Sequence, residues 1–166
     1  MRIMMVGQAD GGIGKTSFWY RWALGNFPSR TMQTMGMDFK VRRFRRGGED
    51  YKIQLFDSAS RPRFDFITAT CLQQYDVDGI LVFVSRYDRD SLLTATQWLE
   101  RIRVGTPTSV TDEYGGPILI PPCDPNASIM LVGAMGDGKY SRMICACHTW
   151  SALRSRARVW TWWFRP

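Results

Sequence analysis

Runs of apolar residues mark the strands that this chain is expected to form. Uninterrupted runs are typical of parallel strands that helices cover on both faces. Two further strands are expected around Gly47-Gly48, because a glycine pair between extended segments favours a hairpin turn. The expected strands are Ile3–Val6, Phe39–Phe44, Tyr51–Phe56, Gly79–Val84 and Ile129–Val132.

Segments with helical spacing of apolar residues separate these runs. The first helix is expected to end at Gly25-Asn26, since glycine commonly follows the last residue of a helix. Asp90 or Ser91 is the expected N-cap of the third helix. The expected helices are Lys15–Leu24, Phe64–Tyr75 and Asp90–Ile102.

This alternation indicates an α/β fold, with a mostly parallel sheet between helices and a ligand site at the carboxyl ends of the strands. The length of 166 residues fits one domain. Residues 104–128 are rich in Pro, Gly, Thr and Ser and are long for a connection, so we interpret them as an inserted loop. No apolar run approaches the roughly 20 residues that a membrane span needs.

Composition narrows the class of protein and its compartment. The 22 basic residues outnumber the 15 acidic ones, and residues 138–166 contain basic but no acidic residues. A basic end can attract nucleic acid or an anionic membrane, although a solubilising role is the commoner one. The four cysteines form no CxxC pair, which favours a reducing compartment and a cytoplasmic location.

A glycine-rich loop, Gly11-Gly12-Ile13-Gly14-Lys15-Thr16, follows the first strand and opens the first helix. In such a loop backbone N–H groups surround a phosphate, Lys15 can reach the β and γ phosphates, and Thr16 can coordinate Mg²⁺. The strict phosphate-loop pattern has glycine at position 9, where this chain has Ala9. Either Ala9 fills that position or the loop Gly7–Gly14 is longer than usual, and we favour the longer loop.

Motifs that follow in chain order make the loop specific to a family. Thr34-Met35-Gly36-Met37-Asp38-Phe39 resembles the first switch of Rab proteins, T-I-G-V-D-F, and Leu55-Phe56-Asp57-Ser58-Ala59 resembles their W-D-T-A motif. Arg63-Phe64 matches the R-F of the second switch. The chain therefore resembles a divergent small GTPase of the Ras superfamily, Rab/Ras-like, over residues 1–103 and 129–137. This resemblance implies the three-layer P-loop NTPase fold.

The resemblance also implies a site for GTP or GDP and Mg²⁺. Phe27 would pack against the guanine base, and Asp57 would hold Mg²⁺ through water. The implied catalytic residues are Lys15, Thr34 and Arg61. The implied metal-binding residues are Thr16, Thr34 and Asp57, and the implied nucleotide-binding residues are Gly11, Gly12, Ile13, Gly14, Lys15, Thr16, Ser17, Phe27, Thr34, Ser60 and Asp137.

Two motifs depart from the family pattern. In the second switch, Ser60 replaces a glycine and Arg61 replaces the glutamine that orients the attacking water. Glutamine donates and accepts hydrogen bonds but arginine only donates, so GTP hydrolysis is expected to be weak. The guanine motif N-K-x-D reads Ala134-Met135-Gly136-Asp137, which keeps only the aspartate. Weaker affinity and weaker discrimination against ATP are expected, because each lost polar partner costs about 1–3 kcal/mol.

Residues 138–166 do not resemble the last strand and closing helix of the family. They form either a divergent segment that packs where that strand would lie or the product of a shifted reading frame or mis-joined exon, and the sequence leaves both open. No cysteine ends the chain, so no prenyl group and no stable membrane anchor are expected. We divide the chain into a G domain, 1–137, and a divergent C-terminal segment, 138–166.

The predicted function is a guanine-nucleotide-dependent switch, whose effectors and regulators contact Met35–Phe39 and Arg61–Phe64. A catalytically inactive pseudo-GTPase that binds other proteins is the main alternative. Nucleic-acid binding through Arg42-Arg43-Phe44-Arg45-Arg46 is less favoured, since a charged strand beside a hairpin turn is usually a solvated surface. Trp19 and Trp22 have the spacing of core or partner-facing residues.

Overall fold

The structure is a computed structural model that describes residues 1–7, 13–59, 61, 64–85, 87–105, 107–111, 115–119, 127–134, 144–148 and 158–161. As far as residue 104 its elements follow the alternation that the sequence predicts, whereas the strands at residues 107–111, 117–119, 144–148 and 158–161 were not predicted. The helices are α1 (Lys15–Leu24), α2 (Asp65–Gln74) and α3 (Arg89–Val104). The strands are β1 (Arg2–Gly7), β2 (Met37–Arg46), β3 (Glu49–Ser58), β4 (Gly79–Ser85), β5 (Pro107–Thr111), β6 (Pro117–Leu119), β7 (Ser128–Ala134), β8 (Ile144–His148) and β9 (Arg158–Thr161).

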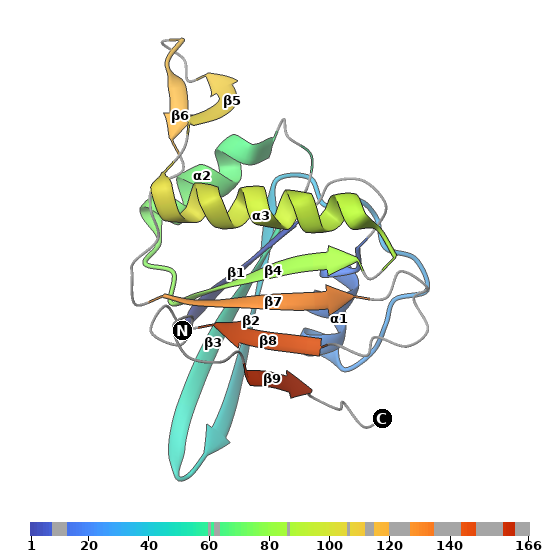
Figure 1. Ribbon diagram of the computed structural model, residues 1–166. Helices are drawn as coiled ribbons and strands as arrows, with labels where there is room; N and C mark the ends of the chain where they lie inside the picture. The colour runs from blue at the N-terminus through green and yellow to red at the C-terminus, as the bar shows by residue number, and fades with distance from the viewer. Residues whose placement is uncertain are drawn as a thin grey trace.

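One sheet of seven strands, in the order β2-β3-β1-β4-β7-β8-β9, forms the centre of the molecule (Figure 1). Its inner strands β3, β1, β4 and β7 pair in parallel, as expected for strands joined through helices. The outer strands β2, β8 and β9 pair antiparallel. The predicted α/β fold with a sheet that is parallel at its centre is confirmed.

Helices cover the sheet on both faces and create two apolar cores (Figure 1). On one face, Trp98 and Ile102 of α3 pack with Met4, Phe56 and Val82 of the sheet. On the other face, Trp19 of α1 packs with Met5, Leu55 and Phe83. Residues of opposite cores alternate along the strands because successive side chains point to opposite faces.

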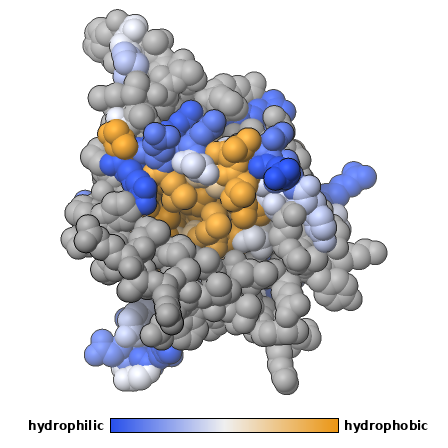
Figure 2. Space-filling model, viewed as in Figure 1, coloured by the Kyte–Doolittle hydropathy of each residue, from blue (hydrophilic) through white to orange (hydrophobic). Residues whose placement is uncertain are grey.

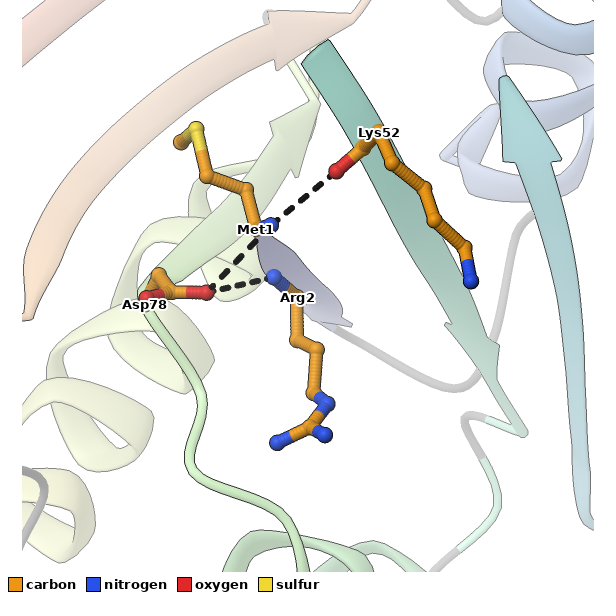
Figure 3. A network of polar contacts seen from close by, with 4 residues as sticks. All are labelled: Met1, Arg2, Lys52 and Asp78. Atoms are coloured by element: carbon orange, nitrogen blue, oxygen red, sulfur yellow. Dashed lines mark hydrogen bonds and ion pairs between the residues drawn. The ribbon is translucent and has the colours of Figure 1, made fainter. Parts of the chain in front are cut away.

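The aspartate before β4 links the starts of three parallel strands, and Figure 3 shows its contacts with the start of β1. Its side chain accepts a hydrogen bond of 2.6 Å from the backbone N–H of Arg2, and its own N–H donates to the carbonyl of Arg2. Its carbonyl accepts from the N–H of Ser128 at the start of β7. Asp78 therefore fixes the register of β1, β4 and β7 at the end of the sheet opposite the site.

The N-cap prediction for α3 is wrong. The cap is Asp88, whose carboxylate accepts a hydrogen bond of 2.9 Å from the N–H of Asp90. Ser91 is fully buried instead, and its hydroxyl accepts from the N–H of Ser85 and donates to the carbonyl of Asp88. The helix begins earlier than predicted because an aspartate accepts from the first turn more readily when its own backbone is extended.

Two surface features complete the fold. The segment 104–128 contains a small antiparallel sheet of β5 and β6, which stands apart from the main sheet (Figure 1). Apolar side chains gather below α3, over β4 and β7 (Figure 2), and the partly buried Ile129 and Leu131 belong to the core on this face. None of the described helices is long and apolar enough to cross a membrane.

Candidate functional site

The first helix begins directly after a glycine that turns the chain into it. Gly14 has a φ of 86°, in the left-handed region that glycine adopts without strain, and its carbonyl accepts from the N–H of Phe18. The start of α1 therefore lies beside the carboxyl end of β1, and the N-terminus of a helix is a favourable place for a phosphate group. The predicted residues Gly11 and Gly12 lie outside the described residues.

Three oxygen-bearing side chains from three separate segments meet at the start of α1. The hydroxyl of Thr16 donates to Oδ2 of Asp57 across 2.7 Å, and the hydroxyl of Thr34 donates to the same oxygen across 3.0 Å. The two hydroxyl oxygens lie 3.0 Å from each other. The structure thus brings together all three predicted metal-binding residues, which we call the Thr–Thr–Asp cluster.

Asp57 lies in the buried stretch 55–58 at the end of β3, which places its carboxyl group inside the protein. The residue is fully buried, and its Oδ1 accepts no hydrogen bond from any described residue. Burial raises the pKa of this carboxyl, while the hydroxyl of Thr16 and the charge of Lys15 oppose the shift. Asp38, directly opposite on β2, raises the pKa further by like-charge repulsion. A cation at this position would relieve both effects.

Lys15 supplies the positive charge of the site. Its side chain is almost fully buried, and burial lowers its pKa to about 8, although the charge of Asp57 acts in the opposite direction. A buried ammonium group favours the binding of an anion, because the negative charge stabilises its protonated form. The predicted contact of Lys15 with the phosphates of a nucleotide stays a prediction.

The donor set fits Mg²⁺. Two hydroxyl oxygens and a carboxylate are hard oxygen ligands, which this ion prefers. Thr16, Thr34 and Asp57 would hold the ion, and the ion would supply positive charge beside the buried carboxylate. The Oδ1 of Asp57, which lacks a donor, can accept a hydrogen bond from a metal-bound water.

The segments that carry Thr34 and Asp57 are also joined through the backbone. The N–H of Ala59 donates to the carbonyl of Gly36 across 2.7 Å. Gly36 has a φ of 81°, and a Cβ there would lie 3.3 Å from Cδ1 of Ile67 in α2. The positive φ and the close side chain of Ile67 both favour a glycine where the first switch approaches the second.

The other predicted site residues have different environments. Ile13 is buried in the core beside α1, and Ser17 is partly buried in the helix. Phe27 is 36% exposed, with the guanidinium of Arg21 5.4 Å from its ring centre, so its predicted contact with a base stays a prediction. Arg61 is exposed, and its carbonyl accepts from the N–H of Phe64. Ser60 and Asp137 lie outside the described residues.

Sequence analysis missed one neighbour of the site, Asp38, and one hydrogen bond of a core residue, Trp19. Asp38 was assigned only to a motif, although its pairing with Asp57 follows from the register of the predicted hairpin. Trp19 was interpreted as core or partner-facing, and it is core: it is 2% exposed. Its indole N–H donates to the carbonyl of Leu55 across 3.1 Å, a contact that spacing along the helix does not reveal.

Comparison with protein families shows which family builds this site. A sequence model of the Ras family matches residues 2–149, most of the chain. The chain belongs to the Ras family. The predicted resemblance to small GTPases of this superfamily is confirmed.

Among individual proteins, this Ras-family chain is similar to the GTP-binding protein ypt1 of Schizosaccharomyces pombe. The two are 32% identical over 101 residues, which cover 61% of this chain and 48% of the ypt1 sequence. The chain thus matches about half the length of this curated relative. The match supports a divergent small GTPase.

Proposed function

We propose that this protein is a molecular switch that binds GTP or GDP together with Mg²⁺. The observation that carries the proposal is the convergence of Thr16, Thr34 and Asp57, within 3.0 Å of one another, beside the buried Lys15. These residues come from α1, the segment before β2 and the end of β3, so only the folded chain assembles them. Bound Mg²⁺ would supply positive charge that neutralises the phosphates.

The switching mechanism follows from how the cluster is held. Asp57 and Thr16 lie on rigid elements, whereas Thr34 lies in the loop before β2. A terminal phosphate that attracts Thr34 would also move Gly36, whose carbonyl accepts a hydrogen bond from the N–H of Ala59. The two switches would therefore order together with the phosphate present and loosen together after its loss.

Hydrolysis is proposed to be weak. Arg61 occupies the position of a water-orienting glutamine, and its exposed guanidinium can donate but not accept hydrogen bonds. The alternative is a pseudo-GTPase that binds nucleotide or partner proteins without turnover. Single-turnover release of phosphate from GTP separates the two: a rate above hydrolysis in buffer supports the weak enzyme, and a rate equal to it supports the pseudo-GTPase.

The metal site is tested by calorimetry of GDP binding with and without Mg²⁺. Thr16→Ala removes one hydroxyl of the cluster and should abolish most of the gain in affinity that Mg²⁺ provides. Thr94→Ala is the matched control, because its exposed hydroxyl bonds only within α3. Equal Mg²⁺ dependence in Thr16→Ala and wild type would refute the proposed site.

The remaining predictions are carried forward as proposals. Effectors and regulators would contact the switch surface, where Met35 is 79% and Phe39 52% exposed. The Rab-like first switch favours signalling in vesicle traffic and a cytoplasmic location. Residues 1–137 would act as the G domain, and 138–166 as a separate segment. Nucleic-acid binding stays a disfavoured alternative, since Arg45 pairs with Asp50 and Arg42 donates to the carbonyl of Trp22.

A further inference from the structure

Trp19 joins the helix of the phosphate site to both strands of the β2–β3 hairpin. Its indole N–H donates to the carbonyl of Leu55 in β3. The ammonium group of Lys40 in β2 lies 4.3 Å from the centre of its ring. Lys40 and Leu55 are direct cross-strand partners, so one indole contacts both members of a single pair.

The contact between Trp19 and Leu55 lies close to the Thr–Thr–Asp cluster along both α1 and β3. Thr16 and Trp19 are about one helical turn apart on α1, and Leu55 and Asp57 are alternate residues of β3, whose side chains lie on the same face. The hydrogen bond from Thr16 to Asp57 therefore joins α1 to β3. The hydrogen bond from Trp19 to Leu55 joins the same helix to the same strand about one helical turn further along α1.

We propose that Trp19 is a positioning residue for the metal site, and that its hydrogen bond to Leu55 sets the separation of Thr16 and Asp57. The inference rests on the proposed binding of nucleotide and Mg²⁺. Mg²⁺ demands near-ideal octahedral geometry, so a small shift of α1 against β3 weakens its coordination more than it weakens contacts to the nucleotide. Trp19 acts through Thr16 and touches neither ligand.

The burial of Trp19 explains why the indole holds α1 in one place. The side chain is 2% exposed, and its single donor would be unsatisfied without Leu55. Phenylalanine at this position would preserve an aromatic ring in the core and remove only the donor and part of the ring. The variant would then lose the directional contact of Trp19 that fixes how far α1 lies along β3, while most of the apolar packing would remain.

The test measures release of fluorescent GDP from the full chain as Mg²⁺ is added. In Trp19→Phe, the Mg²⁺ concentration for half-maximal slowing of release should rise about tenfold, as for other residues that orient metal ligands. Release without Mg²⁺ should stay within about twofold of wild type, since contacts to the nucleotide remain. Trp22→Phe, the matched indole on the same helix, should change neither quantity.

Two results would overturn the inference. One is an unchanged half-maximal Mg²⁺ concentration in Trp19→Phe. The other is a rate of release that rises equally with and without Mg²⁺, which indicates general loosening of the fold. If Trp19→Phe does not fold, Lys40→Gln is measured in its place. Loss of the cation–π contact should raise the half-maximal Mg²⁺ concentration about two- to threefold, and an unchanged concentration would contradict the inference.

Failure of the proposed function gives a different result. The proposed function itself is contradicted if the wild-type protein binds no GDP, or if Mg²⁺ does not change its rate of GDP release. Wild-type protein that binds GDP with a clear Mg²⁺ effect, beside a Trp19→Phe variant with the same effect, contradicts only the role of Trp19.

Discussion

The hydroxyl of Thr16 donates to Oδ2 of Asp57 across 2.7 Å, which joins the first residues of α1 to the end of β3. The contact brings together residues that lie far apart in the sequence and that the parallel pairing of β1 and β3 sets side by side. It leaves the Oδ1 of Asp57 buried without a described donor. A structure that maintains a buried carboxylate in this state is arranged for a cation, and the predictions below follow from that arrangement.

Nucleotide affinity should depend on pH through Lys15. Burial lowers the pKa of its ammonium group to about 8 in the free protein, and bound phosphates favour the protonated form. Affinity should therefore be constant below about pH 8 and fall by up to tenfold per pH unit above it, because binding then requires uptake of a proton. Titrations of GDP between about pH 7 and 9 measure this slope. Lys15→Ala should show none, and a flat wild-type profile contradicts the assignment.

Arg61→Gln should speed hydrolysis of bound GTP. The glutamine restores a side chain that both donates to and accepts from an attacking water, and we expect a gain of at least about tenfold in single-turnover phosphate release. Arg43→Gln makes the same change of charge on the exposed hairpin and should leave the rate unchanged. A rate in Arg61→Gln equal to wild type would show that Arg61 does not limit hydrolysis.

Gly7→Ala should destabilise the fold through a steric clash. A Cβ at this position would lie 2.8 Å from the carbonyl oxygen of Phe83 and 2.7 Å from Cδ1 of Ile13. The expected loss is about 3 kcal/mol of unfolding free energy, measured by urea denaturation. Gly48→Ala adds the same methyl group where no heavy atom lies within 4 Å, so it should cost only about 1 kcal/mol of backbone strain. Equal losses in the two variants argue against the clash.

Asp88→Ala should lower stability without changing nucleotide binding. The variant removes the carboxylate that accepts from the N–H of Asp90 and should cost about 1 kcal/mol in thermal or urea unfolding. Asp90→Ala loses only a favourable charge near the helix N-terminus, about 0.5 kcal/mol. A larger loss of stability in Asp90→Ala than in Asp88→Ala would show that Asp90 is the N-cap.

The success and failure of sequence analysis have physical causes. Long apolar runs predict strands well, since burial on two faces leaves no room for polar side chains, as in Gly79–Val84. Asp88 was missed as a cap because Asp88, Asp90 and Ser91 all have suitable side chains, and only backbone geometry selects among them.

The sequence predicted those site residues that belong to short local motifs. Each of Thr16, Thr34 and Asp57 stands in a short motif, so their types and positions were readable from the sequence. Their mutual distances and the burial of Asp57 depend on packing between α1 and β3, which the sequence pattern does not encode. The contact between Trp19 and Leu55 belongs to the same category, since a tryptophan at helical spacing indicates burial but not its partner.

The most direct test is equilibrium binding of fluorescent GDP, GTP and ATP analogues in the presence of Mg²⁺, with Lys15→Ala beside wild type and Lys52→Ala as an exposed-lysine control. We predict that wild type and Lys52→Ala bind the guanine nucleotides more tightly than ATP, and that Lys15→Ala loses binding by about 100-fold or more, as expected for a buried charge-assisted contact. Absence of binding in wild type, or equal binding in wild type and Lys15→Ala, would contradict the account that Lys15 and the Thr–Thr–Asp cluster form a nucleotide site.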